Sequence, residues 1–155
     1  MKHILIFALL AGLAYGQSLS SLSNAQLKAR AEAIAAQMLP KATAFDFAVS
    51  DIEYQLRRNQ TPSSTVAAER QKFVSDPAVQ QMFSDANAIH AEILKRIRAQ
   101  HAQMRALGLG PAKRTQELAD RSATIITPGN IPESRGGAYV NNRFSELAYE
   151  AQDLK

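Results

Sequence analysis

The sequence contains no cysteine and no tryptophan in its 155 residues. Without cysteine the chain forms no disulfide and offers no thiol chemistry, so packing alone must stabilise its fold. Aromatic residues make up only 6% of the chain and there are seven glycines, whereas alanine and glutamine are abundant. This composition favours helix over sheet, and the length predicts one domain of modest size.

Sequence signatures of known chemistry are also missing. There is no GxSxG, no HExxH and no glycine-rich loop that would hold a phosphate. Asp46, Asp51 and Glu53 point in different directions around a helix, so they do not form a catalytic carboxylate pair. His90 and His101 lie about 16 Å apart along a helix, too far to share a metal ion, and we interpret them as the edge of a packed seam. We therefore expect no enzymatic activity, no catalytic residues, no cofactor and no metal ion.

Residues 1–16 have the plan of a secretory signal peptide. A charged start at Lys2 and His3 precedes an apolar run over residues 4–14, and Ala14-Tyr15-Gly16 supplies a small-x-small end. The run is shorter than the roughly 20 residues that a stable membrane anchor needs. We predict cleavage before Gln17 and export to the periplasm or the medium. Loss of Lys2 would lower the formal net charge from +4 to about +3.

The apolar spacing predicts a long helix over residues 22–58, capped by Ser21 or Ser23. Pro40 interrupts this pattern, but the apolar residues on both sides of it keep one phase. We favour one long helix kinked at Pro40 over two helices joined by a tight turn, although an interior proline costs about 3 kcal/mol. The stripe comprises Leu27, Ala31, Ile34, Met38, Phe45, Val49, Ile52 and Leu56.

Two proline-containing start signals predict the next helices. Thr61-Pro62 should begin a short helix whose inner side carries Val66, Arg70, Phe73 and Val74. Asp76-Pro77 should begin a helix of about thirty residues that runs to Leu107 and ends at Gly108. Its stripe comprises Val79, Met82, Phe83, Ala86, Ile89, Ile93, Ile97, Met104 and Leu107. A weaker helix is expected from Ala112 to about Ser122.

Residues 123–142 contain two prolines, three glycines and three asparagines and show no helical period. We expect an irregular loop that is either functional or disordered, with a short strand over 123–127 that lacks an evident partner. A closing helix should follow over 143–154. The predicted fold is all-α, an elongated bundle or hairpin of long amphipathic, coiled-coil-like helices. It comprises a signal peptide (1–16), a helical domain (17–122), the loop (123–142) and a C-terminal helix (143–155).

Two groups of residues form a candidate contact surface. Phe47 and Tyr54 lie on the far side of the first long helix, where we favour packing by a neighbouring helix over an exposed strip for a partner. The segment from Ile93 to Gln116 has six basic residues and no acidic residue. It is either a solvated helix end, favoured by the helix dipole, or a basic contact surface. The predicted contact surface comprises Phe47, Tyr54, Lys95, Arg98, Arg105, Lys113 and Arg114.

These observations predict an exported, non-enzymatic helical protein that acts by protein contact, as a chaperone-like or adaptor protein. The alternative is a structural subunit of an envelope or of a secretion or conjugation assembly, joined to its neighbours through residues 123–142 and the closing helix. We expect a protein partner or client, with self-association and an anionic surface, either lipid headgroups or an acidic polymer, as further options. Nucleic acid is not expected, because the basic stretch has no interleaved aromatic residues.

Residues 22–26, Leu-Ser-Asn-Ala-Gln, resemble the L-T/S-x-x-Q box that opens a helix in the small periplasmic Spy/CpxP-like chaperones. Those proteins are exported, all-helical, rather basic and similar in length, so the resemblance implies a chaperone that binds its clients by contact. It covers five residues, and the second such box of that family is missing here. Exported helical subunits of conjugation machinery share the same general character.

Overall fold

The structure is a computed structural model that describes residues 18–110 and 112–154, so the predicted signal peptide lies outside the described residues. Within these ranges the chain is all-α, as predicted, and contains no strand. The five α-helices are α2 (Asn24–Arg57), α3 (Val66–Ser75), α4 (Pro77–Ala106), α5 (Lys113–Ala119) and α6 (Gly136–Glu150). Three short 3-10 helices complete this part: η1 (Leu19–Ser21), η2 (Pro128–Asn130) and η3 (Ala151–Asp153).

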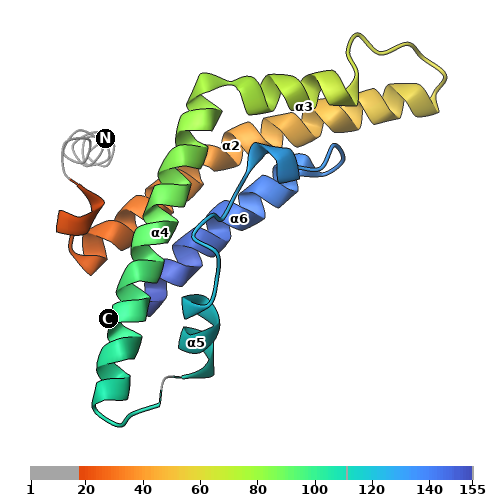
Figure 1. Ribbon diagram of the computed structural model, residues 1–155. Helices are drawn as coiled ribbons and strands as arrows, with labels where there is room; N and C mark the ends of the chain where they lie inside the picture. The colour runs from red at the N-terminus through yellow and green to blue at the C-terminus, as the bar shows by residue number, and fades with distance from the viewer. Residues whose placement is uncertain (1–17, 111, 155) are drawn as a thin grey trace, which may run out of the picture.

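The arrangement centres on α2, which contacts α3, α4 and α6. Figure 1 shows α6 lying along α2 and α3 covering the C-terminal part of α2. Helix α4 crosses α2 and α6 and then extends beyond them, with α5 beside its lower end. The core lies between α2, α4 and α6. None of the described helices is long and apolar enough to cross a membrane.

A single helix, α2, continues through Pro40, which confirms one helix over two. Its start is a capping box, in which the Ser23 side chain accepts from the Gln26 amide at 3.1 Å and the Gln26 side chain accepts from the Ser23 amide at 2.8 Å. The predicted stripe is buried from Leu27 to Ile52. Leu56 shares its phase but is 54% exposed, because it lies in the last turn before the chain leaves the helix.

The start of α4 is as predicted, with Asp76 capping the amides of Ala78 and Val79 and Pro77 in the first turn. Its end is also confirmed, because Gly108 has a φ of +73° and the Leu109 amide donates to the Met104 carbonyl at 2.9 Å. The predicted start of the shorter helix at Thr61-Pro62 is wrong. That helix, α3, begins at Val66, where the Thr65 hydroxyl accepts from the Ala68 amide at 3.1 Å and supplies a side-chain cap.

The closing helix begins seven residues earlier than Arg143, at Gly136. Its first turn finds acceptors on α2, where the Asp46 carboxylate receives the amides of Gly137 at 2.8 Å and Ala138 at 2.6 Å. The glycines allow α6 to approach α2 closely, because a Cβ on Gly137 would overlap the carbonyl oxygen of Ala42. The predicted loop is therefore helical over its last seven residues.

The segment between α5 and α6 is held by side chains of the helices around it. Residues 123–127 do not form the predicted strand. Instead Asn87 on α4 accepts from the amides of Ile125 and Ile126 and donates to the Ile126 carbonyl at 2.9 Å. Arg70 on α3, predicted on the inner side of its helix, donates to the carbonyls of Ile131 and Pro128. Side chains thus replace the backbone partner that a strand would need.

Candidate functional site

Phe47 and Tyr54 are exposed on the side of α2 that faces away from the core. The Phe47 residue is 72% exposed and Tyr54 is 51% exposed. The expected packing by a neighbouring helix is therefore wrong within the described part of the chain. The Tyr54 hydroxyl accepts a hydrogen bond at 3.1 Å from the guanidinium of Arg58, the residue that follows α2.

These two aromatic residues belong to a longer uncharged line on α2. Residues at alternating spacings of four and three follow it along the helix, which is the a/d spacing of a coiled-coil seam. All of them are exposed, and we name them the outer face of α2: Ala29, Ala33, Ala36, Pro40, Thr43, Phe47, Ser50 and Tyr54. The line extends for about 38 Å at 1.5 Å per residue. Sequence reasoning missed it, because alanine, serine and threonine do not stand out in an apolar pattern.

The predicted basic residues do not form one surface. Arg98 donates to the carbonyls of Ala119 at 2.8 Å and Arg121 at 2.9 Å, so it binds the end of α5. Arg114 donates to Asp153 at 3.0 Å and stacks over the Tyr149 ring at 4.1 Å, so it joins α5 to the C-terminal end of the chain. Both guanidinium groups are occupied by contacts within the chain.

The other three basic residues of the predicted contact surface, Lys95, Arg105 and Lys113, are solvated. The Lys95 ammonium lies 3.5 Å from Glu92, and the Lys113 ammonium lies 3.9 Å from Glu117 with its side chain 93% exposed. Arg105 has no ion pair or side-chain hydrogen bond within residues 18–110 and 112–154. Arg105 and Lys113 flank the turn between α4 and α5, so this turn carries two basic side chains of the predicted patch that have no close partner among the described residues.

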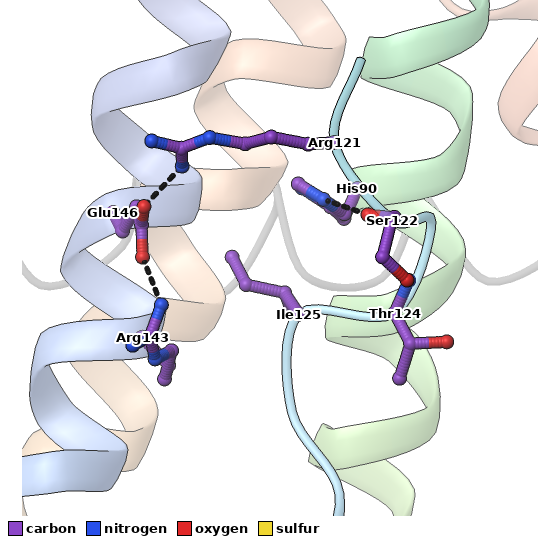
Figure 2. A pocket seen from close by; sticks show the side chains of 7 residues that line it. All are labelled: His90, Arg121, Ser122, Thr124, Ile125, Arg143 and Glu146. Carbon is purple, nitrogen blue, oxygen red and sulfur yellow. Dashed lines mark hydrogen bonds and ion pairs between the residues drawn. The ribbon is translucent and has the colours of Figure 1, made fainter. Parts of the chain in front are cut away.

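A cluster of charged side chains around the buried His90 and Glu150 lies where α4, α6 and the segment after α5 meet. His90 and Glu150 are both almost fully buried, and the His90 Nδ1 lies 2.8 Å from Glu150 Oε2. The other ring nitrogen, Nε2, lies 3.0 Å from the Ser122 carbonyl oxygen. Arg121 binds Glu150 at 2.5 Å and also binds Glu146. Figure 2 shows the part of this cluster that lines the pocket, without Glu150; there Glu146 bridges the guanidinium group of Arg121 and that of Arg143.

Both ring nitrogens of His90 face oxygen atoms, with Nδ1 toward Glu150 and Nε2 toward the Ser122 carbonyl. The Nδ1–Oε2 pair is close but lies off the direction of a good hydrogen bond, which leaves both atoms poorly satisfied. The two side chains therefore lie in close contact without a well-formed hydrogen bond between them.

Arg121 remains charged in this setting. Its partial burial alone would lower the pKa of Arg121, but the hydrogen bond to Glu146 and the negative charge of Glu150 together raise it above its usual value. An open pocket of about 250 Å³ lies beside the cluster and is lined by His90, Arg121, Ser122, Thr124, Ile125, Arg143 and Glu146. Since Glu146 already occupies both guanidinium groups, the cluster joins α4 and α6 to the connecting segment and leaves little free charge for a ligand.

The histidines differ from their expected place. The sequence predicts them at the edge of a packed seam, whereas His90 and His101 are both buried in α4, at 2% and 4% exposure. His101 Nε2 has no hydrogen-bond partner among the described residues. No group of three or more metal-ligating side chains is present in the described ranges. Glu150 is 60 residues from His90 in sequence, so no local pattern could have identified the pair.

In comparisons with protein-family models, curated proteins and solved structures, nothing matches this chain. The likeness of residues 22–26 to the chaperone box has a local explanation. Ser23 and Gln26 form the capping box of α2, and a serine followed three residues later by glutamine is a common way to begin a helix.

Proposed function

We propose that this chain is an exported, non-enzymatic helical protein that acts by contact, as a chaperone-like or adaptor protein. The outer face of α2 is its contact surface. The observation that supports this proposal is the 72% exposure of Phe47 within an uncharged line that has coiled-coil spacing. Exposed contiguous apolar surface in a folded protein typically marks a site of interaction.

The chemistry of the outer face suits an apolar helical segment. Alanine, serine and threonine allow a partner helix to approach the backbone, while Phe47 and Tyr54 provide large apolar side chains that would anchor it. No charged residue interrupts the a/d line, so selectivity for charge would be low. A partner segment would therefore be recognised by its apolar stripe, which an unfolded client also offers.

The alternative, a structural subunit, has less support. That hypothesis relies on residues 123–142 and the closing helix to join neighbouring copies. Ile126 and Ile131 are buried in this chain, and α6 packs along α2. These segments therefore already contact the body of their own molecule.

Suppression of aggregation tests the contact proposal. We expect the wild-type chain to reduce light scattering by a heat-aggregating client, and we expect Phe47→Ser/Tyr54→Ser to lose most of this effect while keeping its melting temperature, because both residues are exposed. Leu107→Ser/Leu109→Ser is a matched control with exposed apolar residues elsewhere. Equal suppression by the Phe47→Ser/Tyr54→Ser variant, together with unchanged size by light scattering, would refute the outer face as the contact surface.

Export is tested separately. Mass spectrometry of the protein from its host should find Gln17 at the N-terminus, as the small-x-small sequence at residues 14–16 predicts. A chain that keeps Met1 and stays in the cytoplasmic fraction would contradict this part of the proposal without affecting the outer face.

A further inference from the structure

The turn between α4 and α5 projects from the body of the protein. No described residue from 102 to 117 is buried, whereas His101 before this stretch and Leu118 after it are. In Figure 1 this turn forms the lower end of the molecule, beyond α2 and α6. We name residues 105–110, 112 and 113 the hairpin tip, because Pro111 lies outside the described residues.

The hairpin tip presents two leucines to solvent. Leu107 is 74% exposed and Leu109 is 56% exposed. Gly108 between them adopts a φ of +73°, which closes the turn, and the Leu109 amide donates to the Met104 carbonyl. A Cβ on Gly108 or Gly110 would meet nothing within 4 Å, so the turn has no neighbour from the described chain close to its glycines.

The hairpin tip is also basic. Arg105 has no ion pair among the described residues. The Lys113 ammonium is 3.9 Å from Glu117, in an exposed ion pair of the kind that contributes little to stability. The sequence from Ile93 to Gln116 contains no acidic residue. The two exposed leucines therefore lie between two cations that are available to an anionic surface.

Contacts behind the hairpin tip hold it in this projecting position. Arg98 binds the carbonyls at the end of α5, and Arg114 binds Asp153 and the Tyr149 ring. The buried Leu118 joins α5 to the core. Because these anchors fix the base of the hairpin, the leucines do not reach back to the core and remain at its apex.

We propose that the hairpin tip inserts into the surface of a lipid bilayer that carries anionic headgroups. A convex apex with two leucines fits the boundary between headgroups and acyl chains, where apolar side chains are buried and adjacent Lys or Arg residues meet lipid phosphates. An acidic protein is a poorer fit, because a convex apex lacks a groove in which a partner would pack. This proposal uses residues separate from the outer face of α2 and does not depend on the proposed function.

A single tryptophan provides the test. The chain has none, so Leu109→Trp introduces one fluorophore at the apex, and Leu56→Trp introduces one at an equally exposed leucine on α2. With vesicles of equal parts phosphatidylglycerol and phosphatidylcholine, we expect emission from Leu109→Trp to shift to shorter wavelength and that from Leu56→Trp to stay unchanged. This comparison also separates apex insertion from any membrane binding by residues 1–17. Added salt should reverse the shift, because it screens exposed charges.

Charge variants test the electrostatic part. In the Leu109→Trp background, Arg105→Gln/Lys113→Gln should weaken vesicle binding by about fivefold for each residue, the usual contribution of a basic side chain near an anionic surface. Arg57→Gln/Lys72→Gln removes two exposed cations from α2 and α3 and should leave binding unchanged.

The proposal is overturned by an equal shift in Leu56→Trp, by equal binding to pure phosphatidylcholine, or by the absence of a shift. An emission shift that appears without vesicles as protein concentration rises would also overturn it and would assign the apex to self-association. Binding to dextran sulfate but not to vesicles would overturn it in favour of an acidic polymer.

Discussion

Asp46 on α2 holds the first turn of α6 through Gly137, which lies 91 residues later in the sequence. The Asp46 Oδ1 accepts the Gly137 amide at 2.8 Å, and its Oδ2 accepts the Ala138 amide at 2.6 Å. An acidic group at a helix start satisfies amides that have no partner within the helix and interacts favourably with the helix dipole. The contact requires the two helix backbones to be very close, and only glycine at position 137 allows this.

Gly137→Ala should destabilise the fold. Its Cβ would overlap the backbone carbonyl of Ala42, which cannot move without shifting α2. We expect the free energy of unfolding to fall by about 1–3 kcal/mol or more, as overpacking does in other cores. Urea unfolding measures this, and Gly129→Ala is the control, because its Cβ would meet nothing within 4 Å. Equal losses in the two variants would show that α6 adjusts freely against α2.

The distance in sequence between a helix end and the residue that caps it explains which helix boundaries the sequence predicted. The starts of α2 and α4 and the end of α4 carry their caps within a few residues, at Ser23, Asp76 and Gly108, so local patterns identified them. The first turn of α6 depends on Asp46, far away in sequence, so local patterns predict its start seven residues too late. Likewise the extended segment at Ile125 finds its partner in the side chain of Asn87, which no strand pattern reveals.

The candidate site was predictable only in part for a similar reason. Phe47 and Tyr54 could be named from the sequence, but their exposure depends on which sides of α2 the other helices cover. A basic side chain in a helical pattern looks the same whether it faces water or a distant carbonyl group. The sequence therefore predicts Arg98 and Arg114 on the contact surface, although both bind groups of their own chain.

Asn87→Ala should release the segment between α5 and α6. The change removes the acceptor for the amides of Ile125 and Ile126 and the donor to the Ile126 carbonyl. Unsatisfied buried groups cost about 1–3 kcal/mol, and we expect a loss of stability in that range. Hydrogen exchange should show faster exchange at these two amides specifically. Asn142→Ala on the exposed side of α6 is the control, and unchanged protection of Ile125 and Ile126 in Asn87→Ala would contradict the assignment.

The His90–Glu150 pair should behave as one unit. Glu150→Leu leaves His90 and Arg121 without a buried carboxylate, and breaking such a pair typically costs about 3–5 kcal/mol. His90→Leu leaves Glu150 with Arg121 alone. The double variant removes both partners. Its loss of unfolding free energy should therefore be smaller than the sum of the two single losses, by about 0.5–3 kcal/mol. A double-mutant cycle in urea measures this coupling, and additive losses would show that the two residues act independently.

Stability should depend on acid through Asp76. The hydrogen bond from the Ala78 amide, followed by that from Lys41 at 3.2 Å, lowers the pKa of Asp76 below its usual 3.8. The charged form is favoured in the folded chain. Its contribution to stability is therefore present above pH 3.8 and is lost as pH falls through the lowered pKa of Asp76. Asp76→Asn should therefore melt at a lower temperature than wild type at neutral pH, and the difference should shrink in acid below pH 3.8. A constant difference at all pH values would rule out the charge as its cause.

Pro40→Ala should stabilise the protein, although it alters the middle of the longest helix. Proline lacks the amide that would bond the carbonyl of Ala36, and it costs about 3 kcal/mol relative to alanine inside a helix. Pro40 is exposed on the outer face, and Met38 and Ala42 on the core side stay buried, so the substitution need not disturb the core. The restored hydrogen bond should outweigh the greater freedom that alanine gives the unfolded chain, which is worth about 0.4–1 kcal/mol. We expect the free energy of unfolding to rise by about 1–2 kcal/mol in urea.

Ala36→Gly in the adjacent turn, an exposed change in the opposite direction, should lower the free energy of unfolding by about 1 kcal/mol and calibrates the helix propensity of this region. A loss of stability in Pro40→Ala would mean that α4 and α6 pack against a bend that only proline maintains.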